Sequence, residues 1–247
     1  GWASTTNPPP PPPRIALIID DIGSSRRVAR QFMDISANLT FAVLPHLPFS
    51  NSLSHEIHAL GCEILLHQPM EPFDHHLNPG PGAAFVGDSM QRIADMLGRN
   101  FQAVPYAIGV NNHMGSRFTS YRREIHFTLE LIKRRGLFFV DSRTSHRSCA
   151  YVTARRINMN TGRRDTFLDN TRHPNTIIDQ LYQLIDRALS TGSAIGIGDP
   201  YPETALALHQ FCSEIQGTGV EIVPVSAVLD HTSPENPKQI QSTVARI

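Results

Sequence analysis

Short apolar runs alternate with amphipathic stretches along most of the chain. The first run, residues 15–19, is an unbroken series of aliphatic residues, which is typical of a strand buried on both faces. The predicted strands cover residues 15–19, 39–44, 63–66, 107–110, 137–140, 166–168, 194–197 and 220–223. Predicted helices lie between them, at residues 51–60, 89–101, 122–135, 148–157, 176–189 and 203–215, with a first helix capped by Ser24 or Ser25. Strand–helix alternation without hairpin signals predicts a parallel α/β architecture.

This pattern predicts one domain over residues 14–231, because no second linker interrupts it. Residues 8–13 are six consecutive prolines, a composition that favours a stiff polyproline II segment, so residues 1–13 are predicted to be a linker. Such a spacer suggests an export signal or anchor upstream, although a merely disordered start is an equal alternative. Residues 232–247, with Ser, Pro, Asn and Gln, are predicted to be a weakly ordered tail.

Composition excludes few classes of protein. Lys plus Arg and Asp plus Glu are both 22, so the formal net charge is +0 and nothing favours a nucleic-acid partner. No stretch approaches the roughly 20 apolar residues of a membrane span. The three cysteines have neither a metal-binding spacing nor the number typical of a disulfide framework.

The predicted strands end in polar residues that carry chemistry. No Gly-x-Gly-x-x-Gly follows the first strand, which argues against a dinucleotide-binding sheet and favours a barrel or an incomplete barrel. In barrels the reactive groups gather at the carboxyl ends of the strands. The residues delivered there are Asp20, Asp21, His67, Asn112, His113, Asp141, Arg143, Asp169 and Asp199. Arg117 is a further candidate for orienting a carboxylate.

Asp20 and Asp21 are adjacent at the first strand end. Successive side chains of a strand point in different directions, so one carboxylate is expected to bind a metal while its neighbour acts as a base. Zn²⁺ accepts mixed Asp and His ligands and keeps a position open for water. The ion lowers the pKa of that water to roughly 7 and polarises a carbonyl, and amide or ester hydrolysis needs both effects.

Five segments together resemble the divergent polysaccharide deacetylase family. They are Asp20-Asp21-Ile22-Gly23, His67-Gln68-Pro69-Met70-Glu71-Pro72, Gly109-Val110-Asn111-Asn112-His113-Met114-Gly115-Ser116, Asp141-Ser142-Arg143-Thr144 and Phe167-Leu168-Asp169-Asn170. The resemblance covers nearly all of residues 14–229, and the Asn-Asn-His-Met-Gly-Ser run is its most specific part. It implies an irregular (β/α) barrel with mostly parallel strands.

The resemblance also implies roles for individual residues. Asp20 would be the general base, with Arg143 and Asp199 as further catalytic residues. Asp21, His67 and His113 would bind a divalent metal, with Zn²⁺ favoured and Mn²⁺, Co²⁺ or Ni²⁺ as alternatives. Asn112, Asp141 and Glu71 would contact the substrate.

Two departures from the family pattern bear on these roles. Glu71 stands where typical deacetylases have a second histidine; it could bind the metal through oxygen, but His113 is favoured as the third ligand. Asp199 stands in Ile-Gly-Asp-Pro where relatives usually have histidine. It could be an acid with a raised pKa, an orienting group or metal ligand, or a sign of lost activity.

The sequence therefore favours an exported, metal-dependent hydrolase that deacetylates a polysaccharide or glycan in the periplasm or cell envelope. The main alternative is a non-catalytic glycan- or envelope-binding module on a degraded deacetylase scaffold. A metal-dependent phosphoesterase is disfavoured, because no Gly-rich phosphate-binding loop is present.

Overall fold

The computed structural model of the chain describes residues 12–230. Residues 1–11 of the predicted linker and the predicted tail lie outside the described residues. Nine strands form one sheet in this part of the chain: β1 (Arg14–Ile22), β2 (Thr40–Val43), β3 (Glu63–Met70), β4 (Ala107–Met114), β5 (Phe138–Asp141), β6 (Thr161–Arg163), β7 (Thr166–Phe167), β8 (Ser193–Gly198) and β9 (Glu221–Ile222). Their order is β6-β5-β4-β3-β2-β1-β8-β7, and β9 pairs with β1. Every strand pair is parallel, as the sequence predicts.

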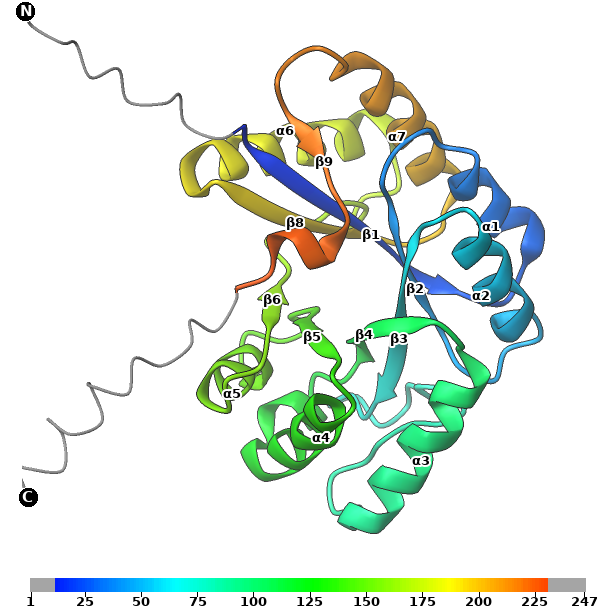
Figure 1. Ribbon diagram of the computed structural model, residues 1–247, viewed down its shortest axis with the longest axis vertical. Coiled ribbons are helices and arrows are strands. Elements are labelled where there is room, and N and C mark those ends of the chain that lie inside the picture. The colour runs from blue at the N-terminus through cyan, green and yellow to red at the C-terminus, as the bar shows by residue number, and fades with distance from the viewer. Residues whose placement is uncertain (1–11, 231–247) are drawn as a thin grey trace, which may run out of the picture.

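Helices cover the outer face of this sheet (Figure 1). They are α1 (Arg26–Met33), α2 (Ser50–Ala59), α3 (Met90–Ala103), α4 (Arg122–Arg134), α5 (Ala150–Arg156), α6 (Pro174–Thr191) and α7 (Pro202–Glu214), with 3₁₀ turns η1 (Phe118–Ser120) and η2 (Val225–Val228). Ser25 caps α1 by accepting a hydrogen bond from the Val28 N–H. No helix among residues 12–230 is long and apolar enough to cross a membrane.

The sheet curls into an incomplete barrel. Strands β6 and β7 stand at opposite ends of the strand order, yet only Arg164 and Asp165 separate them along the chain. The Arg164 N–H donates to the Asp141 carbonyl of β5 at 2.9 Å, and the Asp165 N–H donates to the Ile195 carbonyl of β8 at 2.8 Å. These two residues, here called the seam, therefore join the two edges of the barrel.

Side chains from alternate positions fill two separate cores. On β1, Ile15, Leu17 and Ile19 pack outward in the core shared with the helices, whereas Ala16 and Ile18 face the barrel interior. The interior core also contains Leu65 of β3, Val140 of β5, Ile197 of β8 and, from η2, Val225 and Val228. Side chains alternate between the interior and the outer face along each strand. A polar residue two positions beyond an interior residue therefore faces inward too, and it stands at the mouth of the barrel.

Two features differ from the elements predicted. The eight predicted strands omit β6, whose sequence Thr-Gly-Arg contains no apolar run. Gly162 leaves room there for the interior core, because a Cβ would lie 2.8 Å from the end of the Ile195 side chain. Strands β3 and β4 also extend past their predicted ends, so that His67 and His113 lie within the sheet.

Candidate metal centre

Asp21, His67 and His113 bring three donor atoms together at the mouth of the barrel. Asp21 Oδ1 lies 2.9 Å from His113 Nδ1 and 3.2 Å from His67 Nε2, and the two imidazole nitrogens are 3.3 Å apart. Two ligands bound tetrahedrally to one zinc ion at about 2.0–2.1 Å would be separated by about 3.3 Å. The three atoms, from β1, β3 and β4, thus already have the spacing of a single coordination site.

The oxygen at the centre of this group lacks a partner. Asp21 Oδ1 is buried and makes no hydrogen bond to any described residue, since the nearby imidazole nitrogens do not meet hydrogen-bond geometry. Burial acts to raise the pKa of Asp21, but His113 and His67 outweigh it and hold that pKa well below its usual range. A buried carboxylate oxygen without a hydrogen bond is costly to ionise, and only the two imidazoles, when protonated, or a bound cation can offset that cost here. The mixed Asp/His set fits Zn²⁺ or a similar divalent ion.

A backbone irregularity turns Asp21 toward the same place as Asp20, which stands two positions beyond the interior residue Ile18. The register of β1 against β2 shifts between Ile19 and Ile22, and Asp21 has a left-handed φ of 55°. Both carboxylates consequently face one imidazole: Asp20 Oδ2 is 3.5 Å from His67 Nε2, and Asp21 Oδ1 is 3.2 Å from it. The expectation that the two aspartates point in different directions is wrong, because the bulge interrupts the alternation.

Asn111 links Asp20 to His67. Its Nδ2 donates to Asp20 Oδ1 at 2.8 Å, and its Oδ1 lies 2.8 Å from His67 Nδ1. With the amide donor committed to Asp20, the amide oxygen must accept the proton of Nδ1, which directs Nε2 at Asp21. Nε2 can bind a metal once the imidazolium gives up its second proton. Sequence reasoning overlooked Asn111. The alternation of side chains along the strand could have identified it, because Asn111 precedes His113 by two residues and so shares its face of β4. Asn111 also pairs with His67 in register.

Burial perturbs the pKa of the Asp20 carboxyl. Burial is the largest influence and raises the pKa of Asp20 to about 7, while His67 and the hydrogen bond from Asn111 act in the opposite direction. Burial works to lower the pKa of His67, but Asp20 and Asp21 outweigh it and raise that pKa to about 9. The pair therefore shares a proton readily at neutral pH.

Asp199 ends β8 close to these groups. Its pKa is raised to about 6, first by burial and then by the charges of Asp21 and Asp169. Its N–H donates to Asp169 Oδ2 at 2.7 Å, and Tyr201 Oη donates to Asp199 Oδ2 at 3.3 Å. Asp169 in turn accepts a hydrogen bond from the Thr204 hydroxyl of α7 at 2.6 Å. Asp169 thus fixes the backbone that presents Asp199.

A cavity of about 370 Å³ opens above the donor cluster. Seven of the predicted site residues line it: Asp20, Asp21, His67, Asn112, His113, Arg143 and Asp199. Arg164, which sequence reasoning did not select, also lines it. Its place depends on the seam, and no sequence motif marks that position. Asn112 contributes mainly to the frame, since its side chain bonds the Met114 carbonyl and the Ser142 N–H.

Residues 17–229 match the protein family described as divergent polysaccharide deacetylase. The chain belongs to that family. The uncharacterized protein YibQ of Escherichia coli K12 is 30% identical over 235 residues, which cover 90% of this chain and 71% of that protein.

Solved structures confirm the fold expected of this family. The uncharacterized protein ATU2773 from Agrobacterium tumefaciens C58 superposes with a TM-score of 0.85 and 28% identity over 92% of both chains. A family 4 carbohydrate esterase from Streptomyces lividans, solved in complex with acetate, gives a TM-score of 0.55 and 12% identity over 90% of this chain and 98% of that chain. The second likeness shows that the half-barrel of parallel strands is shared with polysaccharide deacetylases.

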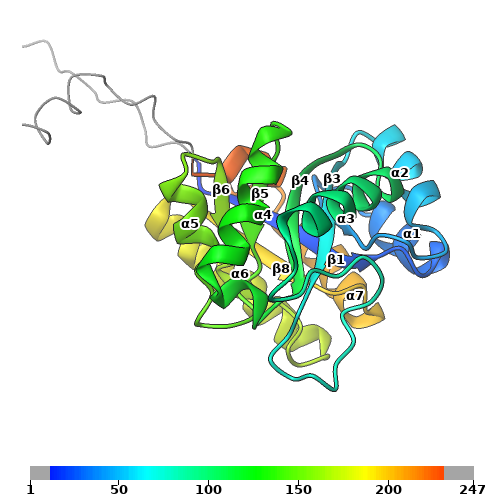
Figure 2. The same ribbon diagram turned by 90° about the horizontal axis from the view of Figure 1, so that it is seen from below.

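Two residues expected to contact substrate in this deacetylase-family chain lie outside the cavity lining. Val140 faces the interior, so its neighbour Asp141 faces the other side of β5. The Asp141 carboxylate accepts hydrogen bonds from the Arg143 N–H, the Ser148 hydroxyl and the Tyr151 N–H. Glu71 accepts a hydrogen bond from the Val86 N–H at 2.7 Å and lies 3.5 Å from Arg117 Nε. Both carboxylates bond to the chain's own donors and fix loops around the cavity, including the loop between β3 and α3 that projects in Figure 2.

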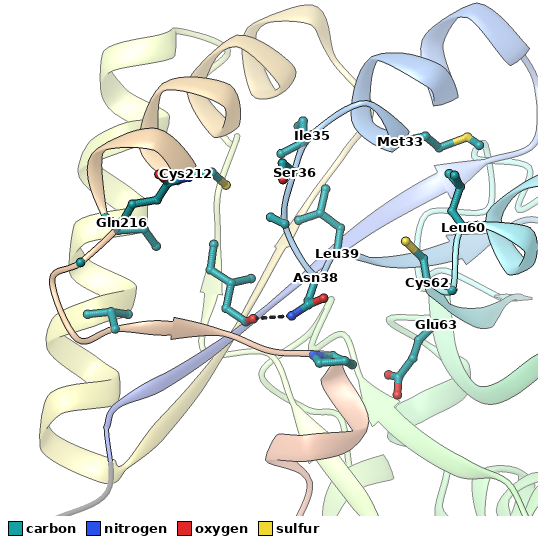
Figure 3. A pocket seen from close by; sticks show the side chains of 17 residues that line it. Met33, Ile35, Ser36, Asn38, Leu39, Leu60, Cys62, Glu63, Cys212 and Gln216 are labelled. Atoms are coloured by element: carbon teal, nitrogen blue, oxygen red, sulfur yellow. Dashed lines mark hydrogen bonds between the residues drawn. The ribbon is translucent and has the colours of Figure 1, made fainter.

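A larger hollow, of about 490 Å³, lies at the opposite end of the barrel (Figure 3). Its walls expose more polar than apolar surface and carry Cys62 and Cys212, and Asn38 Nδ2 donates to the Ile222 carbonyl within it. Its one carboxylate, Glu63, is occupied by hydrogen bonds from Ser226. The cluster of metal-capable side chains therefore lies at the other end, where the strands terminate.

Proposed function

We propose that this chain hydrolyses acetyl groups from an acetylated glycan with a divalent cation held by Asp21, His67 and His113. The observation that carries the proposal is the unpartnered Asp21 oxygen, around which two imidazole nitrogens converge beside the buried carboxylate of Asp20. Membership of the deacetylase family supports the same reaction class.

A divalent ion bound by these residues would polarise the acetyl carbonyl and favour ionisation of water. Asp20 is the proposed base. Asn111 holds its Oδ1 at 2.8 Å, which leaves Oδ2 available to accept the proton of the attacking water. A pKa near 7 suits a base that works at neutral pH, because the carboxylate is basic enough to take the proton while about half of the population is ionised.

Asp199 is the proposed proton donor to the departing amine or alcohol. It lines the same cavity from β8, on a different strand from the ligands, and its pKa of about 6 keeps part of the population protonated near neutral pH. Burial thus lets a carboxyl group serve where relatives usually have histidine.

The alternative function is a non-catalytic glycan-binding module, and the replacement of histidine by Asp199 is the observation that favours it. Acetate release that disappears in Asp20→Asn would eliminate this alternative.

The first experiment combines elemental analysis with acetate release from acetylated oligosaccharides. We expect about one equivalent of metal in the wild type, little in the Asp21→Ala/His67→Ala variant, and full retention in His209→Ala, which alters an exposed helical histidine. Asp20→Asn is expected to keep the metal and to lose activity by about 100-fold or more. A chain that binds no Zn²⁺, Mn²⁺ or Co²⁺ after soaking would contradict the proposal.

We also propose that the protein acts in the cell envelope. The support is the glycan substrate class and the proline run at residues 8–13, which suits a domain held away from an anchor. Fractionation of cells that express the natural gene tests it, and recovery in the cytoplasmic fraction would contradict it.

A further inference from the structure

The geometry points to an anion-binding subsite beside the metal centre, formed by Arg143, Arg164 and His146. We infer that the glycan carries a negative charge, a carboxylate or a phosphate, next to the acetyl group that is removed. This inference rests on the proposed function and adds the substrate class.

Arg143 is held in a strained conformation at the cavity mouth. Its φ is 49°, in the left-handed region that non-glycine residues rarely adopt. Asp141 Oδ1 accepts a hydrogen bond from its N–H at 2.9 Å, and Arg164 Nη2 donates to its carbonyl at 2.8 Å. Its guanidinium is exposed and forms no ion pair within residues 12–230. The backbone is thus fixed at both ends while the charged head group is left available for a ligand.

Arg164 supplies the second positive charge from the seam of the barrel. It is only partly exposed, its Nε donates to the Ser142 carbonyl at 2.6 Å, and its guanidinium lies 5.4 Å from the Phe167 ring centroid. It also forms no ion pair with a carboxylate of the described residues. Burial first, and then the neighbouring charge of Arg143, lower the pKa of Arg164. Two like charges held this close repel one another, and a bound anion would relieve that repulsion.

A separate hollow places these charges where a substituent could sit. Arg143 and Arg164 line both the metal-site cavity and an adjoining hollow of about 240 Å³, whose other walls are Ser145, His146 and Asp165. Asp165 is already engaged, because its Oδ2 accepts a hydrogen bond from the Ile195 N–H and its Oδ1 lies 3.5 Å from Arg187 Nε. The hollow therefore presents two arginines and a histidine to a group that extends from the metal site.

The nearby carboxylates favour the charge of Arg164, but none forms an ion pair with either arginine. Asp141 is engaged by the three donors described above, and Asp20 is held by Asn111. Guanidinium groups with donors to spare bind carboxylate and phosphate through charge-assisted hydrogen bonds. With a neutral glycan, neither guanidinium group would have an ion-pair partner in direct contact among the described residues.

The test compares the binding of neutral and anionic oligosaccharides to the full chain loaded with Zn²⁺. All proteins carry Asp20→Asn, which prevents turnover during the measurement. Tetra-N-acetylchitotetraose is neutral, whereas a hyaluronan tetrasaccharide alternates N-acetylglucosamine with a sugar that carries a carboxylate. N-acetylglucosamine 6-phosphate, compared with N-acetylglucosamine, tests phosphate as the source of charge. Calorimetry gives Kd for each probe at low and high salt.

We expect an anionic probe of one class to bind about 10-fold more tightly than its neutral match, with a preference that weakens in high salt. Arg143→Gln and Arg164→Lys are expected to reduce the preference to about 2-fold or less. Arg27→Gln removes the same charge from an exposed position on α1 and is expected to keep it. Equal melting temperatures of the arginine variants would show that folding is intact.

Equal affinity for neutral and anionic probes, binding of neither class, or a preference unaffected by Arg143→Gln would each overturn the inference. Acetate release by the wild type is measured separately. A charge preference without acetate release would count against the proposed function alone, and release without a preference would count against the subsite alone.

Discussion

At the scale of single residues, Asn111 couples the candidate base to a candidate ligand through one amide group. Removing that amide should free the His67 ring to rotate and should remove the donor that holds Asp20. We predict that Asn111→Ala weakens metal affinity by about 10–100-fold, the usual effect of losing a partner behind a ligand.

Competition with a chromogenic chelator would measure that affinity. Asn170→Ala is the matched control, because Asn170 lines the same cavity and is exposed. Equal affinities in the two variants would show that the amide does not position the ligand.

Asp199 gives a second residue-scale prediction, in the metal-free chain. Its folded pKa of about 6 exceeds the usual value of 3.8, so protonation stabilises the folded state. That contribution is complete below about pH 4 and is lost as the pH rises through 6. The free energy of unfolding of the wild type, relative to Asp199→Asn, should therefore fall by on the order of 2–3 kcal/mol across this range. Urea unfolding with chelator at pH 4.5, 6 and 7.5 measures it, and a constant difference would refute the raised pKa.

The sequence reveals the candidate ligands more readily than the groups around them. The motifs and the positions of the strand ends predict Asp21, His67 and His113. The alternation of side chains along β4 could also have identified Asn111. Arg164 could not be found this way, because its place depends on two sheet edges that meet only in three dimensions. The Asp-Asp sequence also does not predict the left-handed backbone conformation of Asp21.

At the scale of elements, the strands were predictable where both faces are buried. Such strands contain an unbroken run of apolar residues, as residues 15–19 of β1 and residues 194–198 of β8 show. Strand β6 escapes the pattern because a glycine fills its interior position and a threonine its neighbour. Its pairing with β5 comes from the closure of the barrel rather than from local preference.

Two glycines test this distinction between local preference and packing. A Cβ on Gly109 of β4 would lie 2.4 Å from the Phe138 ring, whereas a Cβ on Gly98 of α3 would meet only Arg135 at 3.8 Å. We predict that Gly109→Ala destabilises the chain by about 1–3 kcal/mol. Gly98→Ala should stabilise it by about 0.5–1 kcal/mol, since alanine favours the helix. Thermal or urea unfolding of both variants measures these effects, and the same sign for both would contradict the argument.

At the scale of the whole molecule, the site depends on a sheet that curls almost shut. The candidate ligands come from β1, β3 and β4, the candidate acid from β8, and the arginines from the segments after β5 and β6. The interior core and η2 fill the barrel below them, so the polar groups are held at one end. A cation bound there would link strands that are far apart in the sequence.

Metal binding should therefore raise the melting temperature of the whole domain. An ion at 100 times its Kd that binds only the folded state contributes about 2.7 kcal/mol, which for a domain of this size corresponds to about 5–10 °C. His113→Ala should abolish most of the shift, because it removes one of three ligands. The exposed group Asp74, His75 and His76 could also bind an ion, so His75→Ala/His76→Ala is the control and should keep the shift. Scanning calorimetry with and without Zn²⁺ decides between the sites: a shift that survives in His113→Ala but disappears in the control would place the stabilising ion on the surface loop instead.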